Sequence, residues 1–195
     1  MAEVTVVFAD LTGSTGVFES LGNAKATQAI TRLTQWIGKV CTAQGGEVVK
    51  TLRDGVLMVF TDNTAAIESV TEMQRVHSER IKTWPDKLKM HLQVGMARGE
   101  VIEQSQDYFG DAVNVAARLL DHAGGNETLV TRDVFDDLTW EARSRFRSLD
   151  KVHVRGRAEP VEVHLLARRG ADTAATLLEA RSEPSEPQGL QLVWA

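Results

Sequence analysis

The sequence predicts an α+β domain with a ferredoxin-like core, in which a mixed or antiparallel sheet carries helices on one side. Hairpin signals are interspersed with amphipathic helical segments, instead of the strict strand–helix alternation of a doubly wound sheet. The chain has 195 residues, of which 43% are hydrophobic and 25% are charged. This length suffices for one well-buried domain with a tail, and the composition is ordinary for a globular protein.

The first quarter of the chain contains one strand signal and two helix signals. Residues 4–9 are apolar and largely β-branched, which predicts a buried strand. A short helix opens at Gly13–Ser14, with Ser14 as the candidate N-cap residue, and a longer helix opens at Asn23. The longer helix is expected to stop at Gly45–Gly46, because glycine readily ends a helix.

A hairpin and a third helix are expected next. Residues 48–52 and 56–60 flank Asp54–Gly55, a pair that favours a tight turn because glycine tolerates positive φ. Asn63 is the predicted cap of a helix that ends before Pro85. The remaining expected elements are strands at 88–94 and 99–102, a helix at 110–123, a strand at 128–130, a helix around 134–138, and a strand pair at 152–154 and 161–166.

The composition changes after about residue 170. Residues 1–170 are predicted to form the folded domain and 171–195 a linker-like tail, in which residues 183–187 read Glu-Pro-Ser-Glu-Pro. A polar stretch with proline at this density is typical of linkers. The tail is expected either to dock on the domain or to lead to a further, regulatory module.

Charge and cysteine content exclude several classes of partner. The net charge of −5 argues against broad attraction to nucleic acid or anionic lipid. Cys41 is the single cysteine, which excludes an intrachain disulfide and favours a reducing, cytoplasmic compartment. The N-terminus resembles a first strand and not a signal peptide, and no apolar run approaches the roughly 20 residues of a membrane span.

Two aspartates stand where strand-like runs give way to turns. Asp10 follows the first strand and Asp54 begins the hairpin turn, and a glycine follows each closely. Two carboxylates at the mouth of a sheet, beside backbone N–H groups, are suited to Mg²⁺ or Mn²⁺ with a phosphate ligand. Taken alone, the same residues also fit a helix cap at Asp10 and an ordinary turn residue at Asp54.

Three motifs in order resemble the catalytic domain of class III nucleotidyl cyclases, which include adenylate and guanylate cyclases, and the resemblance is to the bacterial type. They are Phe-Ala-Asp-Leu-Thr-Gly-Ser-Thr at 8–15, Lys-Thr-Leu-Arg-Asp-Gly at 50–55 and Asp-Tyr-Phe-Gly-Asp-Ala-Val-Asn-Val-Ala-Ala-Arg at 107–118. The resemblance covers roughly residues 3–168 and implies the class III cyclase fold. It also implies a reaction in which the ribose 3′-hydroxyl of a nucleoside triphosphate attacks the α-phosphate.

The resemblance assigns metal and phosphate ligands. It implies that Asp10, Asp54 and the backbone of Leu11 hold two Mg²⁺ or Mn²⁺ ions in each active site, which is the arrangement for an in-line displacement. Gly13 and Ser14 would offer backbone groups to phosphate at a helix N-terminus. Thr15 matches the position whose hydroxyl reaches the terminal phosphate, although it also fits an ordinary first-turn residue.

A second set of positions would complete the catalytic machinery. Asn114 and Arg118 are four residues apart and therefore share a helix face. By resemblance, Asn114 orients the ribose and Arg118 neutralises charge on the α-phosphate, while a surface pair of Arg118 with a neighbouring side chain is the alternative. Arg155 stands where the family commonly has a phosphate-binding Lys, and Arg157 is an alternative for that role.

Hydrogen bonding predicts the base. Lys50 and Asp107 match the family's base-reading positions, and a lysine can only donate whereas a carboxylate can only accept. Adenine presents an acceptor at N1 and a donor at N6, which fits this pair, whereas guanylate cyclases resemble Glu and Cys there. The sequence therefore favours ATP over GTP, and cyclic AMP with pyrophosphate as the products.

The resemblance also implies a homodimer, because one active site takes its metal aspartates from one domain and its base readers, Asn and Arg from another. This chain carries both halves, so a two-fold dimer would form two sites.

Arg53 departs from the family, which usually has Gly directly before the second metal aspartate, and Arg at this position could distort the turn. A nucleotide-binding regulatory domain with little turnover, and a guanylate cyclase, are the alternatives.

Overall fold

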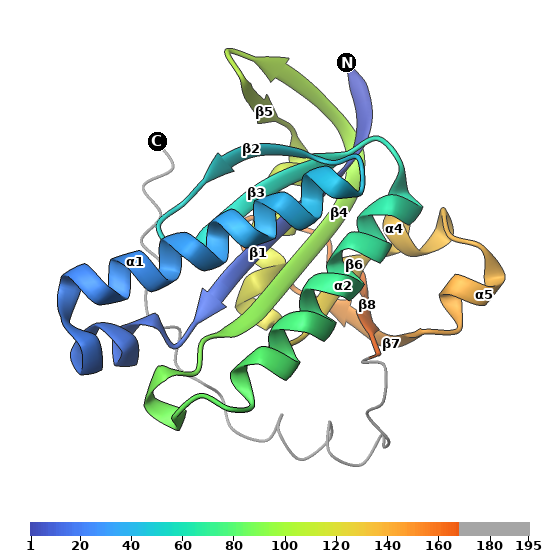
Figure 1. Cartoon of the computed structure of the whole chain (residues 1–195). Helices are drawn as coiled ribbons and strands as arrows, with labels where there is room; N and C mark the ends of the chain where they lie inside the picture. Colours follow the sequence, from blue (N-terminus) through green and yellow to red (C-terminus); the bar gives the residue numbers. More distant parts are fainter. Residues whose placement is uncertain (168–195) are drawn as a thin grey trace.

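The computed structural model describes residues 1–167, so the boundary predicted at residue 170 and the tail 171–195 lie outside the described residues. Within residues 1–167 the centre is an eight-stranded sheet with the order β2-β3-β1-β4-β6-β8-β7, and β5 pairs with β4 (Figure 1). The β4–β6 pair is parallel, whereas the other pairs are antiparallel. The sheet is therefore mixed, and the predicted α+β class is confirmed.

The structure gives each element its bounds. The strands are β1 (Ala2–Thr12), β2 (Glu47–Thr51), β3 (Gly55–Phe60), β4 (His91–Gln104), β5 (Asp107–Phe109), β6 (Thr128–Thr131), β7 (Phe146–Val152) and β8 (Val161–Leu166). The helices are α1 (Ser14–Ala43), α2 (Asn63–Ile81), η1 (Asp86–Leu88), α3 (Asp111–Leu119), η2 (Leu120–His122), α4 (Arg132–Asp136) and α5 (Trp140–Arg143).

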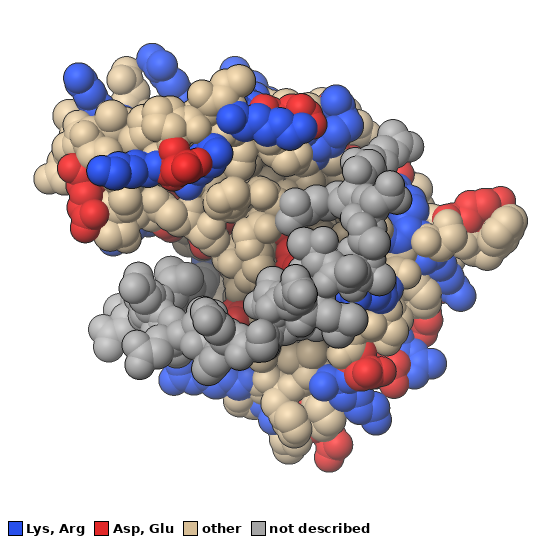
Figure 2. Space-filling view, turned by 90° about the horizontal axis from the view of Figure 1, so that it is seen from below, with Lys and Arg blue, Asp and Glu red and all other residues tan. Residues whose placement is uncertain are grey.

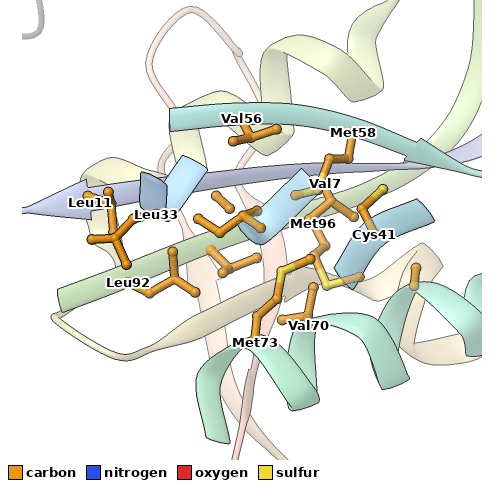
Figure 3. Packing of buried hydrophobic residues seen from close by; sticks show 14 of the residues in the cluster. Val7, Leu11, Leu33, Cys41, Val56, Met58, Val70, Met73, Leu92 and Met96 are labelled. Carbon is orange, nitrogen blue, oxygen red and sulfur yellow. The ribbon is translucent and has the colours of Figure 1, made fainter. Parts of the chain in front are cut away.

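The apolar core lies on both faces of the sheet. Alternate side chains of β1 point to opposite faces. Val7 and Leu11 pack with α1 and α2, whereas Val6 and Phe8 pack with α3. Figure 3 shows the first of these cores, in which Val7 lies among residues of β3, β4, α1 and α2. The prediction that helices lie on one side of the sheet was wrong, because the apolar stripe of α3 packs on the other face.

Helix α1 contains the two helices that the sequence predicts. Gly22 breaks the helical backbone with φ of 74° and ψ of 168°, next to the expected start at Asn23. At the N-terminus the cap residue is Gly13, in the left-handed conformation with φ of 84°, and not Ser14 as predicted. A Cβ on Gly13 would lie 2.8 Å from the carbonyl oxygen of Lys89, so both the conformation and the space require glycine.

The cap of α2 also differs from the prediction. The carboxylate of Asp62 accepts from the backbone N–H of Ala65 at 3.0 Å, so the cap is one residue earlier than predicted. The adjacent Asn63 is buried and bridges other elements. Its amide donates to the carbonyl of Val134 at 2.8 Å, and its oxygen accepts from the hydroxyl of Thr5 at 2.9 Å. Asn63 therefore joins β1, α2 and α4.

Two strand boundaries were wrong in a way that matters for the site. The strands predicted at 88–94 and 99–102 are one strand, β4, which pairs with β1 along Ala2–Thr12 and continues into a hairpin with β5. Figure 1 shows this β4–β5 hairpin extending away from the body of the sheet. Near the chain's end, β7 begins at Phe146, whereas the sequence predicts a strand only from residue 152.

Helix α3 lies very close to the sheet. A Cβ on Gly95 of β4 would overlap the carbonyl oxygen of Ala116, so only glycine permits this approach. Ala116 and Leu119 are fully buried at the contact. The position of α3, and of the polar side chains it carries, is thus fixed by direct contact between helix backbone and strand.

The surface is mixed in charge. On the face shown in Figure 2, Lys and Arg side chains alternate with Asp and Glu side chains, in keeping with the modest net charge. Among residues 1–167, no helix has both the length and the apolar character of a membrane span.

Candidate functional site

Strand pairing brings Asp10 and Asp54 together. Asp10 lies opposite Gly55 in the β1–β3 ladder, and Asp54 occupies the turn between β2 and β3. A Cβ on Gly55 would lie 2.9 Å from Oδ1 of Asp10, so glycine gives the Asp10 carboxylate its space. The backbone N–H of Leu11 donates to the carbonyl of Asp54 at 2.9 Å and ties the turn to β1.

The two carboxylates repel each other in a poorly solvated place. Burial and, to a smaller extent, the negative charge of Asp54 together raise the pKa of Asp10 to about 7. The hydroxyl of Ser14 donates to Oδ2 of Asp54 at 3.1 Å. In place of the predicted capping role, the Ser14 side chain therefore binds the carboxylate of Asp54.

These residues fit a divalent cation. Within residues 1–167, no group of three or more His, Cys, Asp or Glu side chains is arranged to hold a metal ion. Two nearby carboxylates can still suffice, since Mg²⁺ is commonly bound by one or two carboxylates together with waters and substrate phosphates. The like-charge repulsion between Asp10 and Asp54 is what a divalent cation would offset.

A cleft borders the same turn. It has a volume of about 500 Å³ and is lined by Thr15, Phe18, Asn23, Thr27, Ile30, Thr31 and Arg53. Thr15, the predicted ligand of the terminal phosphate, lies exposed in the first turn of α1 and forms part of this wall. The Arg53 guanidinium lies 5.9 Å from the centre of the Phe18 ring, on the cleft side of the turn.

Arg53 leaves the turn intact. The described non-glycine residues with positive φ do not include Arg53, so this position has no conformational need for glycine. The N–H of Leu52 donates to the carbonyl of Gly55 at 2.8 Å and closes the hairpin. The distortion that the sequence suggested for Arg53 is absent from the described backbone.

Lys50 and Asp107 contact each other. Nζ of Lys50 lies 2.7 Å from Oδ2 of Asp107, and each side chain is about 30% exposed. The hydrogen bond from Lys50 lowers the pKa of Asp107 below its usual value, so this carboxylate stays ionised at neutral pH. The N–H of Tyr108 donates to Oδ1 of Asp107 at 2.9 Å. The two predicted base-reading residues thus meet between β2 and β5.

Asn114 and Arg118 project from α3 as the sequence predicts. Asn114 is exposed, whereas Arg118 is partly covered by the β7–β8 loop. A Cβ on Gly156, which has φ of 82°, would lie 2.8 Å from Nη1 of Arg118. In the described chain, Arg118 forms no ion pair with a neighbouring acid, which is the alternative the sequence left open.

The β7–β8 loop carries the two arginines considered for phosphate binding. Arg157 pairs with Asp111 of α3, with Nη1 and Oδ2 3.1 Å apart. Arg155 is exposed on the other side of Gly156. The sequence did not predict the Arg157–Asp111 pair or the contact of Gly156 with Arg118. The available signal in the sequence was the glycine of Arg-Gly-Arg, a residue that favours turns and adopts a positive φ here.

The predicted site residues form three groups within one chain. The first is Asp10, Leu11, Asp54 and Ser14 with the adjoining Gly13 and Thr15; the second is Lys50 with Asp107; the third is Asn114 and Arg118 with the Arg155 loop. In residues 1–167, no hydrogen bond or ion pair joins Asn114 or Arg118 to Asp10 or Asp54.

A family model described as the adenylate and guanylate cyclase catalytic domain matches residues 1–168. An adenylate cyclase of Streptomyces coelicolor is 29% identical over 135 residues, which cover 69% of this chain and 34% of that protein. The chain thus spans about a third of the length of the curated relatives it matches.

Solved structures with this fold include cyclases named for either base. An adenylate/guanylate cyclase/hydrolase from Silicibacter pomeroyi has a TM-score of 0.73 and 28% identity, covering 87% of this chain and 98% of that one. The guanylate cyclase domain of a protein from Catenaria anguillulae, in complex with GTP, has a TM-score of 0.69 and 20% identity, covering 86% of this chain and 97% of that one. At that identity the second likeness concerns the fold alone.

Proposed function

The chain belongs to the adenylate and guanylate cyclase catalytic domain family, and from this premise we propose that it converts ATP into 3′,5′-cyclic AMP and pyrophosphate. The observation that carries the proposal is the meeting of Asp10 and Asp54 where β1 ends and β3 begins, in a partly buried place where burial and the charge of Asp54 raise the pKa of Asp10. Above about pH 7 both carboxylates are negatively charged and repel each other, and a bound cation would offset this repulsion.

Each residue group has a role in the proposed reaction. Asp10, Asp54 and the carbonyl of Leu11 would hold two Mg²⁺ or Mn²⁺ ions. When bound, such ions lower the pKa of the ribose 3′-hydroxyl and neutralise charge on the triphosphate. Asn114 orients the ribose, and Arg118 neutralises the charge that develops on the α-phosphate. The 3′-hydroxyl loses its proton to solvent, its oxygen forms a bond to the α-phosphorus, and the bond from the α-phosphorus to the bridging oxygen breaks as pyrophosphate leaves.

The phosphates have further ligands in the proposal. Gly13 and Ser14 offer backbone N–H groups at the start of α1, where the helix dipole favours an anion. Thr15 supplies a hydroxyl to the terminal phosphate. Arg155, exposed in the β7–β8 loop, supplies a cation, and this role falls to Arg155 because Arg157 is already paired with Asp111.

The proposed active enzyme is a homodimer in which each site combines Asp10 and Asp54 of one subunit with Lys50, Asp107 and α3 of its partner. Ile102 and Phe109 support a dimer contact on the β4–β5 hairpin. They are direct cross-strand neighbours on β4 and β5, and they are 54% and 53% exposed. An exposed apolar pair on an extended hairpin is typical of a surface that another chain covers.

Replacing Phe109 by Glu is expected to weaken dimerisation at least about tenfold, because a charge would be buried against an apolar surface. Analytical ultracentrifugation over a concentration series measures the dissociation constant. Trp140→Glu is the matched control, since Trp140 is 76% exposed on α5, away from this hairpin. Equal weakening by both substitutions, or by neither, would contradict a dimer contact at Phe109.

The choice of ATP over GTP rests on the Lys50–Asp107 pair. Lys50 can donate to N1 of adenine, and Asp107 can accept from the N6 amino group. Guanine reverses both polarities, and a buried mismatch leaves polar groups without partners. The short contact between the two side chains places donor and acceptor next to each other, as the edge of one base requires.

The double substitution Lys50→Glu with Asp107→Cys is expected to shift the preference from ATP toward GTP by at least about tenfold in kcat/KM, because it reverses the donor and acceptor pattern. Initial rates of cyclic AMP and cyclic GMP formation measure the ratio. Lys50→Arg keeps a donor at this position and serves as the control, for which ATP should remain preferred. An unchanged base preference in the double variant would remove Lys50 and Asp107 from base recognition.

The proposal itself is tested by incubating the purified full chain with ATP or GTP and with Mg²⁺ or Mn²⁺, and by measuring both cyclic nucleotides. Cyclic AMP in excess of cyclic GMP is expected. Preferred formation of cyclic GMP would indicate a guanylate cyclase. Nucleotide binding without either product would indicate a regulatory domain that has kept the fold.

A further inference from the structure

Arg53 is an exposed cation directly beside a proposed metal ligand. It precedes Asp54 in the β2–β3 turn, and its guanidinium lies over the Phe18 ring at 5.9 Å. In residues 1–167 it has no ion pair with any carboxylate, including those of Asp10 and Asp54. An arginine stacked on an aromatic ring keeps its N–H groups available in the plane of the guanidinium.

The cleft that Arg53 borders has the character of an anion site. Arg53 is the single charged residue among those that line it, and no carboxylate belongs to the lining. Thr15, Asn23, Thr27 and Thr31 add side chains that can donate hydrogen bonds, while one wall is formed by Phe18. A positive charge with several neutral donors and no acid is suited to a phosphate group.

The position of this cleft indicates which phosphate it receives. It shares Thr15 with the proposed binding site for the terminal phosphate, and it shares the β2–β3 turn with Asp54. The guanidinium is held against Phe18 and is not paired with Asp10 or Asp54, so it is placed to bind phosphate and not to displace a metal ion. One short turn would thus present a carboxylate and a cation side by side.

We propose that Arg53 binds the terminal phosphate of the nucleoside triphosphate, on the side of the cleft formed with Thr15 and Phe18. This inference rests on the proposed function for the identity of the ligand, but it concerns a residue that stands where the family usually has glycine. Arg53 would contribute to a charge-assisted, bidentate contact that glycine lacks. It selects triphosphates over diphosphates and steadies the leaving pyrophosphate.

The test compares two ligands that lack the attacking hydroxyl. Calorimetric titration of the full chain with 3′-deoxy-ATP and with 3′-deoxy-ADP, both with Mg²⁺, measures affinity without turnover. Arg53→Gln is expected to lower the affinity for 3′-deoxy-ATP about tenfold and to change the affinity for 3′-deoxy-ADP by less than about twofold. Arg53→Lys keeps the charge and should recover part of the loss.

Arg32→Gln is the matched control, because Arg32 is an exposed arginine of α1 next to the cleft residue Thr31 but not part of the lining. It should leave both affinities unchanged. The assignment of Arg53 to the terminal phosphate would be overturned if Arg53→Gln lowered the affinity for both nucleotides equally. It would also be overturned if the affinity for 3′-deoxy-ATP were unchanged or higher.

The outcome is separable from the fate of the proposed function. If the wild-type chain binds 3′-deoxy-ATP but forms no cyclic nucleotide from ATP or GTP, the cyclase proposal fails. The ratio of the affinities for 3′-deoxy-ATP and 3′-deoxy-ADP still decides the role of Arg53. If the chain turns over ATP and Arg53→Gln leaves the preference for triphosphate unchanged, the cyclase proposal stands and the role of Arg53 fails. If the wild-type chain binds the triphosphate no better than the diphosphate, the inference is overturned.

Discussion

Replacing Asp10 by Asn is expected to lower turnover at least about 100-fold while raising the melting temperature of the metal-free protein. The loss of activity follows because an amide is a poor ligand for Mg²⁺, and a 100-fold loss corresponds to about 2.7 kcal/mol of transition-state stabilisation. The gain in stability follows because the substitution removes a buried negative charge beside Asp54. Cyclic AMP formation and thermal unfolding in EDTA measure the two effects.

The pH dependence gives the sign of the stability effect. Asp10 has a folded-state pKa of about 7 against 3.8 for the ordinary group, so the folded state binds the additional proton between these values. The stability of the metal-free protein therefore falls as pH rises from about 4 to about 7, by at most about 4 kcal/mol. The advantage of Asp10→Asn should be greatest at pH 8 and should shrink towards pH 4.

Asp107→Asn is the control for this experiment, because its carboxylate is stabilised by Lys50 and its pKa is lowered. This variant should gain no stability at pH 8. Mg²⁺ or Mn²⁺ should raise the melting temperature of the wild-type protein but not that of Asp10→Asn. A lower melting temperature for Asp10→Asn at pH 8 in EDTA would contradict the burial argument, and undiminished turnover would remove Asp10 from the metal site.

Mixing two inactive variants should restore activity. Asp54→Ala removes a metal ligand, and Arg118→Ala removes the α3 cation, so each homodimer lacks a complete site. A mixed dimer contains one complete site if metal ligands and Arg118 come from different subunits. Random pairing makes half of the dimers mixed, each with one intact site of two, so about a quarter of wild-type activity is expected in a refolded equimolar mixture.

The control mixture combines Asp54→Ala with Asp10→Ala. Both lesions then lie in the same half of the site, so the mixed dimer has no complete site and should remain inactive. Recovery with this pair, or no recovery with the first pair when mixed dimers are demonstrated by mass spectrometry, would be incompatible with sites shared between subunits.

The positions of Asp10 and Asp54, each at the end of a strand, could be predicted from local sequence. An Asp-Gly turn limits the register of the hairpin, and apolar runs on either side leave few ways to pair β3 with β1. Once this long-range pairing of β3 with β1 is assumed, Asp10 and Asp54 meet at the same end of the two strands. The meeting of Lys50 with Asp107 was less accessible, because it depends on how far the β4–β5 hairpin extends beyond the sheet.

Other features depend on tertiary partners and were wrong in the sequence-based prediction. Asp62 and Asn63 are both good cap residues, and the choice between them is made by Thr5 and Val134, which bind the Asn63 side chain. A helical stripe identifies the buried face of a helix but not the face of the sheet it covers, so α3 was expected on the same side as α1 and α2.

The backbone contact between Gly95 and Ala116 constrains how catalysis could be controlled. At this one contact the backbone of α3 lies directly against β4, so the helix that carries Asn114 and Arg118 has little room to shift against the sheet. In the proposed dimer, a signal that separates Asn114 and Arg118 from Asp10 and Asp54 of the partner subunit would therefore move one subunit against the other as a rigid body. We therefore expect activity to be switched by a change between two subunit arrangements, and not adjusted gradually by repacking of side chains around α3.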